Sequence, residues 1–300
     1  MADAVKVSKK EYKGWKNCIE VSNGIVDLIA TTDVGPRIIR YGFVNKENEF
    51  CEVPDQVGTT GGDKWKIYGG HRLWHSPEGD RTYAPDNSKI QWRKKKNGII
   101  LRQPVEEFTL IQKEMEVTMS PDSTKVTVVH RLTNRGAWEI ELSAWALSVM
   151  AAGGVEVIPQ TSKNTGYLPN RVVSLWPYAK MNDKRVYWGE KYIMIRQDRD
   201  AKTPFKIGVS NEDGWAAYAN HGHLFVVKFD YFENTVYPDF SSSYETYTCD
   251  FMLEMETLSP LMFLAPGETI EHIETWELYD NVKVPENEEE VDKIIIPLVK

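Results

Sequence analysis

The chain has 300 residues, of which 41% are hydrophobic and 27% are charged. This is the composition of an ordinary globular protein that can bury a large core. The formal net charge of −8 argues against nucleic acid or an anionic membrane surface as a partner. Cys18, Cys51 and Cys249 are too few and too unevenly placed for a disulfide scaffold or a thiolate metal site.

The pattern of apolar residues gives no sign of a membrane span or a targeting segment. No apolar run approaches the length of about 18 residues that a transmembrane helix requires. The first twenty residues lack the apolar core of a secretory signal. We therefore expect no membrane partner and a cytoplasmic location.

The first half of the chain is predicted to consist of strands separated by turn residues. The predicted strands are residues 18–21, 25–30, 37–43, 90–93, 99–102, 108–119, 125–133 and 138–150. Asn-Gly pairs at 23–24 and 97–98 are typical of tight hairpin turns, so the basic run at 93–96 is expected at an exposed hairpin tip. In residues 138–150 an alternating pattern becomes continuously apolar, which predicts a strand that becomes buried on both faces.

The second half continues the strand pattern after two polar, irregular segments at 159–169 and 177–183. Strands are predicted at 172–176, 192–196, 206–210, 215–219, 224–231, 249–257, 261–264 and 269–278. Residues 285–291 are compatible with one or two helical turns, and no segment of 12 or more residues has helical periodicity. The sequence therefore predicts an all-β protein, a large antiparallel β-sandwich forming a single domain over residues 1–300, with less than about 10% helix.

The stretch 68–80 concentrates residues that can carry chemistry. If it is extended, His71 and His75 share one face, while Arg72 and Trp74 share the other. Two imidazoles about 7 Å apart could act as a proton-transfer pair or contact sugar hydroxyls. A polar loop with a buried aromatic plug is the alternative interpretation.

Two late strands also carry charged residues. Glu254 and Glu256 alternate with apolar residues, so they share one face and lie about 7 Å apart. Lys228 shares a face with Val226 and Asp230 in the strand before them. The alternative for the glutamates is an exposed outer face, where alternating charges are common.

The remaining histidines are weaker candidates. His221 and His223 flank a glycine in a predicted turn and lack a third metal ligand nearby. His130 and His272 alternate with apolar neighbours and are expected to be structural residues satisfied by hydrogen bonds. We therefore expect no metal site.

Several common catalytic patterns are missing from the chain. It has no glycine-rich phosphate loop, no nucleophile elbow around a serine and no metalloprotease helix. A strand-borne carboxylate with a histidine remains, and such a pair can open a sugar ring reversibly by proton transfers alone. No cofactor is expected for that chemistry. Ten tryptophans and fourteen tyrosines suit sugar stacking, although aromatic rings also fill β-sandwich cores.

Seven sequence blocks, spread over most of the chain, resemble a bacterial family related to the galactose mutarotases (aldose 1-epimerases). The blocks are residues 69–74, 83–87, 132–136, 145–150, 254–260, 264–268 and 276–278. The resemblance implies a twisted β-supersandwich whose concave face binds a carbohydrate. It also implies a histidine acid and a glutamate base. The mutarotase order of leucine, histidine and two glycines is replaced here by Gly69-Gly70 before His71.

The resemblance implies Glu256 or Glu254 as the base and His71 or His75 as the acid, all converging on one cleft. The residues expected to contact the sugar are Arg37, Arg72, Trp74, Glu78, Asn170, Arg171 and Lys228. The expected partner is a free sugar or an oligosaccharide, and the oligomeric state is left open. A non-catalytic carbohydrate-binding protein and a polysaccharide lyase or hydrolase on the same scaffold are the alternatives.

Overall fold

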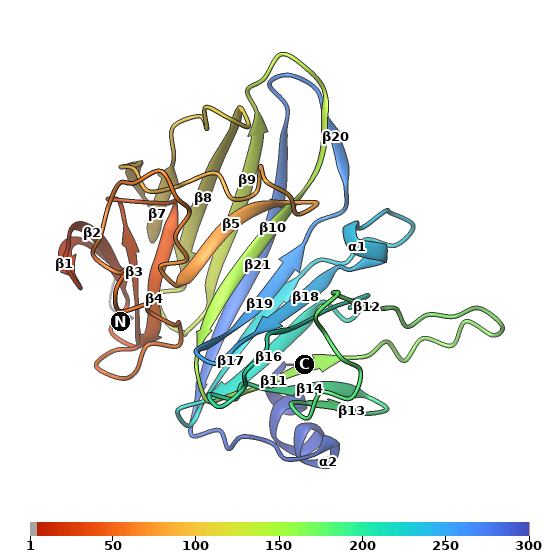
Figure 1. Cartoon of the computed structure of the whole chain (residues 1–300). Helices are drawn as coiled ribbons and strands as arrows, with labels where there is room; N and C mark the ends of the chain where they lie inside the picture. The colour runs from red at the N-terminus through yellow and green to blue at the C-terminus, as the bar shows by residue number, and fades with distance from the viewer. Residues whose placement is uncertain (1–4, 300) are drawn as a thin grey trace.

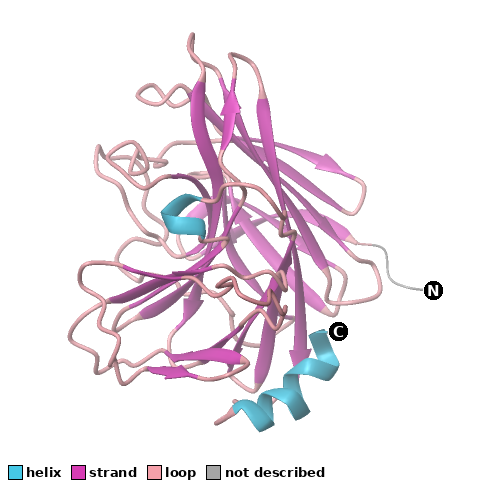
Figure 2. Cartoon of the chain, turned by 90° about the vertical axis from the view of Figure 1, so that its right-hand side faces the viewer, coloured by secondary structure: helices cyan, strands magenta, loops and turns pink. Residues whose placement is uncertain are grey.

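The computed structural model describes residues 5–299, and it confirms the all-β prediction (Figure 1). Within these residues the strands form two antiparallel sheets of 11 and 10 strands. Strands dominate the view in Figure 2, where one short helix lies in front of the strands and the other helical pieces lie at the lower edge near the C-terminus. This is the predicted β-sandwich.

The first sheet carries the residues that matter most for the site. Its strands are β1 (Lys6–Tyr12), β2 (Trp15–Ser22), β3 (Val26–Thr31), β4 (Arg37–Phe43), β5 (Gly70–Ser76), β10 (Ile140–Ala151), β12 (Val173–Leu175), β15 (Phe205–Val209), β18 (Tyr244–Thr248), β19 (Met252–Leu258) and β20 (Met262–Leu264). Their spatial order is β1-β2-β3-β4-β5-β10-β19-β18-β15-β12, with β20 paired to the start of β10. The order makes β5, β10 and β19 neighbours although they are far apart in the sequence.

The second sheet packs against the first. Its strands are β6 (Gln91–Lys95), β7 (Gly98–Arg102), β8 (Ile111–Met119), β9 (Val126–Asn134), β11 (Val155–Pro159), β13 (Val186–Trp188), β14 (Tyr192–Arg196), β16 (Trp215–Asn220), β17 (His223–Phe229) and β21 (Thr269–Asp280). The spatial order is β13-β14-β11-β16-β17-β21-β9-β8-β7-β6. A tight turn at Lys96-Asn97 joins β6 and β7, one residue before the predicted position, because Gly98 already pairs with Lys95 in the ladder.

Helical structure is limited to short elements in the described part of the chain. They are α1 (Pro238–Ser241), α2 (Glu288–Glu290), the π-helix η1 (Val291–Ile295) and α3 (Ile296–Val299). The last three form one continuous helical segment that begins inside the predicted range 285–291. The side chain of Asn287 caps its N-terminus by accepting a hydrogen bond from the Glu290 amide at 3.0 Å. Val291 and Ile295 pack in an apolar cluster with β11 and β16. None of these helices has the length and apolar character needed to cross a membrane.

Four strands, β1, β11, β13 and β18, were not predicted. The edge strand β1 has the sequence KVSKKEY, and its residues are mostly exposed, so it lacks a buried apolar face. The strand β18 has the polar sequence YETYT, yet nearly all of it is buried. In both strands backbone pairing with a neighbour overrides the polar composition.

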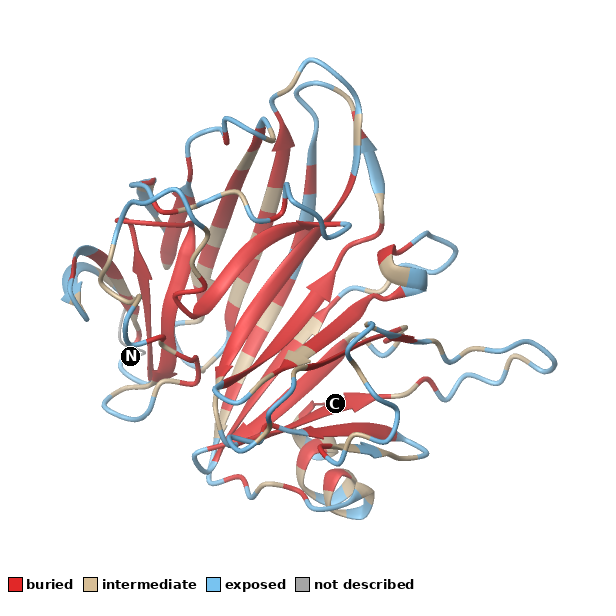
Figure 3. Cartoon of the chain, viewed as in Figure 1, coloured by how far each residue is buried: buried red, intermediate tan, exposed pale blue. Residues whose placement is uncertain are grey.

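The centre of the first sheet is buried on both faces (Figure 3). Leu73, Leu253 and Met255 point into the main apolar core between the sheets. Trp74 and Trp145 belong to a second cluster on the outer face, which is the face turned away from the second sheet. The predicted double burial in the second half of β10 is therefore confirmed.

Candidate functional site

A pocket of about 310 Å³ lies on the outer face of the first sheet, over β5, β10 and β19. Seven of its lining side chains are aromatic: Trp65, Trp74, Tyr83, Trp145, Tyr178, Tyr247 and Phe251. Its charged lining residues are Arg72, Glu78, Lys206 and Glu254. This volume is at the lower end of the range of about 300–1,000 Å³ that is usual for small-ligand sites.

Strand alternation places these side chains. Arg72 and Trp74 are two residues apart in β5, so both point to the outer face, and Leu147 and Trp145 lie opposite them in β10. On the other side of β10, Glu256 pairs with Leu147. Residues from three strands distant in the sequence thus form adjacent rows under the pocket.

The Arg72–Glu254 ion pair forms one end of the charged lining. Arg72 Nη2 donates to Glu254 Oε1 at 2.9 Å, and both side chains are almost completely buried. The guanidinium also lies 4.1 Å from the ring centre of Trp74 and 5.1 Å from that of Trp65. Burial lowers the pKa of Arg72, and the nearby Glu254 carboxylate opposes this effect. The pair and the rings therefore fix a planar charged group at the pocket wall.

A second charged group surrounds Lys206 of β15. Its Nζ lies 3.0 Å from Glu256 Oε2 and 2.9 Å from Glu245 Oε2, so two carboxylates share one cation. Trp145 Nε1 donates to Glu256 Oε2 at 2.8 Å. The ammonium also lies 4.4 Å from the ring centre of Trp145 and 4.6 Å from that of Trp176. We call Lys206, Glu245 and Glu256 the lysine cluster.

Burial controls the charge state of the lysine cluster. Burial raises the pKa of Glu256 to about 7, although the charge of Lys206 opposes the rise. Burial also raises the pKa of Glu245, again against the effect of Lys206. Burial by itself would lower the pKa of Lys206, but the two carboxylates raise it above its usual value overall. Lys206 is therefore firmly protonated, whereas Glu256 titrates near neutral pH.

The structure places Arg72, Trp74, Glu78 and Glu254 in the lining of one pocket. Their roles toward a ligand stay predictions. Trp74 is only 5% exposed. It packs against three aromatic rings, 5.1–5.5 Å away between ring centres. It therefore acts mainly as the aromatic plug of the alternative interpretation. Glu256 is fully buried behind Lys206 and Trp145 and is not part of the lining.

His71 and His75 point the other way, into the space between the sheets. His71 Nε2 lies 2.7 Å from His130 Nε2 of β9, in the second sheet. Burial and the charge of Lys113 lower the pKa of His75 to about 4. The expected convergence of these histidines with the glutamates is therefore wrong. Successive residues of β5 alternate between faces, and Arg72 occupies the outer one.

Arg37 also lies away from the pocket lining, where it holds backbone in place. It is fully buried, and its Nη1 donates to the carbonyl oxygens of Ile67 and Gly69 at 3.0 and 2.9 Å. Its Nη2 donates to Asp86 Oδ2 at 2.9 Å. Arg37 thus joins the loop before β5 to the loop that carries Asp86, and supports the pocket only indirectly.

The other three residues expected to contact a sugar are not part of the lining either. Asn170 and Arg171 lie in the loop between β11 and β12, and their side chains donate to carbonyl oxygens of the same loop. Lys228 is in β17 of the second sheet, 3.0 Å from Glu277. The spacing of these residues along the chain does not indicate which sheet they belong to.

Several lining residues were not among the sequence candidates, namely Trp65, Tyr83, Trp145, Tyr178, Lys206 and Tyr247. Lys206 was identifiable as a candidate from the sequence, because it is a single cation between Phe205 and Ile207 at a predicted strand. A lysine at such a position is rarely buried without a partner. Trp65 and Tyr178 lie in irregular segments, where no periodicity indicates the direction of a side chain.

Comparison with known proteins adds information about the fold. No protein-family model matches the chain, and no curated protein matches it. Solved structures do match. A galactose mutarotase-like protein from Clostridium acetobutylicum has a TM-score of 0.54 at 12% identity, over 92% of this chain and 99% of that one. Another, from Lactobacillus casei, has a TM-score of 0.52 at 10% identity, over 88% of this chain and 100% of that one.

A third match is a TPR-domain containing protein from Parabacteroides distasonis. Its TM-score is 0.59 at 14% identity, over 90% of this chain and 49% of that one. The same sandwich therefore also occurs as part of a longer chain. The matches to the two galactose mutarotase-like proteins extend over nearly the whole length of those proteins. Together with the two-sheet architecture, they agree with the fold that the sequence blocks implied. The protein has the galactose mutarotase-like fold.

Proposed function

We propose that this protein binds carbohydrate and that the pocket over β5, β10 and β19 holds one sugar ring or a short oligosaccharide. The observation that carries the proposal is an aromatic-lined pocket that contains a buried Arg72–Glu254 ion pair. Aromatic rings stack on the apolar faces of sugars, and a planar guanidinium beside a carboxylate offers donors and an acceptor to neighbouring hydroxyls. The galactose mutarotase-like fold of the chain supports the same conclusion.

The exposed aromatic rings of the pocket provide the surface for stacking. Tyr178 is 41% exposed and Phe251 is 44% exposed, whereas Trp74 and Trp145 are almost completely covered. Trp65 Nε1 and Arg72 Nε are buried donors that have no acceptor among the described residues. Both residues line the pocket, but these two atoms are covered, so the exposed rings rather than these donors support the proposal.

The charge balance of the pocket favours a neutral sugar over a polymer of sugar acids. Arg72 is paired with Glu254, and Lys206 is shared by Glu245 and Glu256. Neither cation is therefore left to neutralise a ligand carboxylate. The small volume of the pocket points in the same direction, and both properties make a polysaccharide lyase the weaker alternative.

A cofactor-independent sugar isomerase is the second candidate. It is favoured by Glu254, a carboxylate in the lining that a sugar hydroxyl can reach. In that reaction Glu254 would remove the proton of the anomeric hydroxyl, and another group would protonate the ring oxygen. The ring would open and close again on the opposite face.

The isomerase interpretation lacks a suitable general acid. Both histidines lie on the far face of β5, so the hydroxyl, thiol and ammonium groups that line the pocket belong to tyrosines, Cys249 and Lys206. Burial raises the pKa of Tyr83 and Tyr178, and the carboxylates raise that of Lys206. Groups that hold their protons so firmly are poor acids at neutral pH. Binding without turnover is therefore the better-supported function.

Saturation-transfer NMR with a panel of free sugars tests the proposal. At least one sugar is expected to show saturation transfer, and Tyr178→Ala is expected to weaken its binding about tenfold. Tyr187→Ala is the matched control, because Tyr187 is 49% exposed on β13 of the second sheet, outside the pocket. If no sugar binds, or if both variants weaken binding equally, the proposal fails.

Polarimetry on freshly dissolved α-glucose and α-galactose separates the two candidates. A binding protein leaves the spontaneous rate of anomer exchange unchanged. An isomerase accelerates it, and Glu254→Gln should then lower the rate by about 10²–10⁴-fold, the usual contribution of a general base. Acceleration by the wild-type protein together with a slow Glu254→Gln variant would replace the binding proposal with the isomerase.

A further inference from the structure

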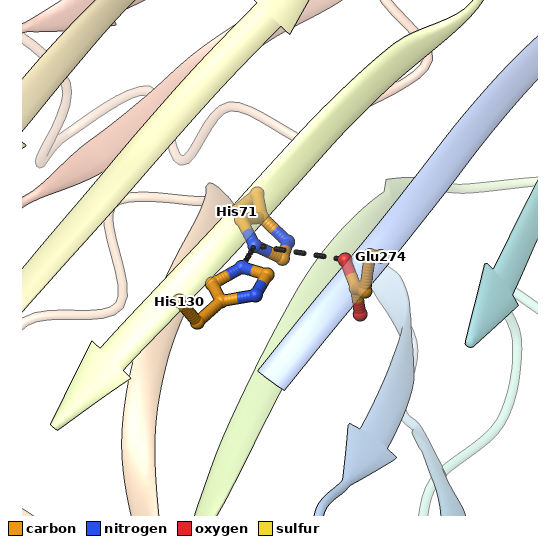
Figure 4. Close-up of side chains that lie close together, drawn as sticks. All are labelled: His71, His130 and Glu274. Carbon is orange, nitrogen blue, oxygen red and sulfur yellow. Dashed lines mark hydrogen bonds and ion pairs between the residues drawn. The ribbon is translucent and has the colours of Figure 1, made fainter. Parts of the chain in front are cut away.

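A second polar cluster lies on the opposite face of β5, between the two sheets. It consists of His71 from β5, His130 from β9 and Glu274 from β21, drawn in Figure 4. One ligand-type atom from each residue lies within 4.8 Å of the other two. All three side chains are buried, with 0–1% exposure. Two imidazoles and a carboxylate are among the commonest ligands of zinc in proteins.

In both histidines the ring nitrogen that points away from the cluster, Nδ1, forms a hydrogen bond, as it does in metal-binding histidines. His130 Nδ1 donates to the backbone carbonyl of His272 at 3.0 Å, which leaves the Nε2 lone pair of His130 directed at the cluster. His71 Nδ1 lies 2.9 Å from Ser148 Oγ. Hydrogen bonds of this kind orient a metal-binding imidazole and fix its tautomer. Burial lowers the pKa of both rings, so both are neutral and can bind a cation at neutral pH.

Glu274 is a buried carboxyl group without a cationic partner among residues 5–299. It accepts hydrogen bonds from Thr257 Oγ1 at 2.5 Å and from Trp276 Nε1 at 2.8 Å. His71 Nε2 is 3.8 Å away but is neutral. Burial raises the pKa of Glu274 to about 7, because these two hydrogen bonds only partly compensate for the loss of water. A buried carboxylate is normally paired or coordinates a metal.

We propose that His71, His130 and Glu274 bind one divalent transition-metal ion, Zn²⁺ by ligand type, and that this ion joins the two sheets. The site is additional to the sugar pocket, and it goes against the expectation from the sequence that no metal is bound. A tetrahedral ion with bonds of about 2.0–2.1 Å holds its ligand atoms ~3.3 Å apart. The two distances from His71 Nε2, 2.7 Å to His130 Nε2 and 3.8 Å to Glu274 Oε2, lie on either side of that value. The third pair, His130 Nε2 and the Glu274 carboxylate, lies within 4.8 Å, so the Glu274 carboxylate must move toward the two imidazoles when the ion binds.

Metal binding requires one proton of the cluster to change its position. In the metal-free state one proton lies between the two Nε2 atoms, and it belongs to His71 because His130 carries its own proton on Nδ1. On metal binding this proton moves to His71 Nδ1, where Ser148 Oγ accepts it. Both imidazoles stay neutral, and Glu274 binds as the carboxylate, so any proton that it holds in the metal-free state is released to solvent. The ion is enclosed by the core, so its role is structural, and it is expected to enter during folding.

Metal analysis of the full-length protein tests this site. The protein is unfolded in guanidinium with a chelator and refolded with or without Zn²⁺. Refolding with Zn²⁺ should give about one bound ion per chain and a higher Tm, since an ion that binds only the folded state stabilises it. The bound ion should resist chelators until the chain unfolds. Refolding with Co²⁺ should give the absorption of a low-coordinate nitrogen and oxygen site.

Three substitutions show which residues bind the metal. His130→Gln and Glu274→Gln should abolish stoichiometric binding. His272→Gln is the matched control and should retain it, because its ring donates to Thr257 and only its backbone carbonyl contacts His130. If wild-type protein refolded with excess Zn²⁺ or Co²⁺ holds no stoichiometric ion, the site does not exist. If His272→Gln loses the ion as completely as His130→Gln, the ligand assignment is wrong. Sugar binding plays no part in either outcome.

Discussion

The two faces of β5 carry polar clusters that are stabilised in opposite ways. On the outer face, beside a pocket, Arg72 pairs with Glu254, and Lys206 is shared by Glu245 and Glu256. On the inner face, His71 and His130 are neutral and bond to each other and to neighbouring polar groups inside the core. Both sets of residues are almost completely buried, so the difference lies in their partners: a permanent cation accompanies the carboxyl groups of the outer face, whereas the imidazoles of the inner face lose their charge.

The largest expected effect is the loss of the only cation in the lysine cluster. Lys206→Met leaves Glu245 and Glu256 buried together, so we expect the free energy of unfolding at pH 7 to fall by about 3–5 kcal/mol. Urea denaturation measures this change. Lys228→Met is the control, because Lys228 forms a half-exposed pair with Glu277 and should lose at most about 1 kcal/mol. Equal losses in the two variants would contradict the special role of the outer cluster.

The assignment of His71 to the inner face is tested by measuring the stability and the sugar affinity of the same variant. His71→Gln removes the contact with His130 in the core, so the free energy of unfolding should fall by about 2–3 kcal/mol. Sugar affinity should stay within about twofold of wild type, because Arg72 and Trp74 remain in place on the other face. Denaturation and NMR titration measure the two quantities. A large loss of affinity in a protein of unchanged stability would return His71 to the sugar site.

The outer face is also expected to show its own dependence on pH. Glu256 has a pKa of about 7 in the folded protein and an ordinary value of 4.5. Between these values the folded state binds more protons than the unfolded state, so this group makes stability fall as pH rises. Relative to Glu256→Gln, wild type should lose on the order of 1–3 kcal/mol of stability from pH 4.5 to 7. Denaturation of both proteins across this range tests the trend, and parallel curves would refute it.

The inner face should show the opposite trend. Burial lowers the pKa of His272 from 6.5 to about 4. Between these values the unfolded state binds more protons, so stability rises with pH. Relative to His272→Gln, wild type should gain on the order of 1–3 kcal/mol from pH 4 to 6.5. A difference between the two proteins that falls with pH would mean that His272 is charged in the core.

The smallest expected effect concerns the shape of the cation in the pocket. Arg72→Lys keeps the positive charge but loses the planar group that lies over Trp74 and donates to Glu254. Sugar binding should weaken about tenfold, which corresponds to about 1.4 kcal/mol. Arg171→Lys, in the loop away from the pocket, should leave affinity unchanged in the same NMR titration. An unaffected Arg72→Lys variant would show that charge alone matters at this position.

Local sequence patterns were enough to predict most of the strands and the alternation within them. The Asn-Gly turns and apolar periodicity located β3, β4, β6 and β7 to within about two residues, because backbone geometry ties turn residues and side-chain direction to local sequence. The same alternation already separated His71 from Arg72. It also placed Glu254 and Glu256 on one face of β19.

Only the tertiary structure decided which of those faces borders the pocket. The neighbours β5, β10 and β19 are joined by backbone pairing between residues far apart in the chain, and no local pattern encodes that order. Burial of polar β18 depends on its pairing with β15 and β19, where Glu245 meets Lys206. Because side chains alternate along a strand, adjacent residues point to opposite faces of the sheet. Which of these faces packs against the other sheet depends on how the whole chain folds.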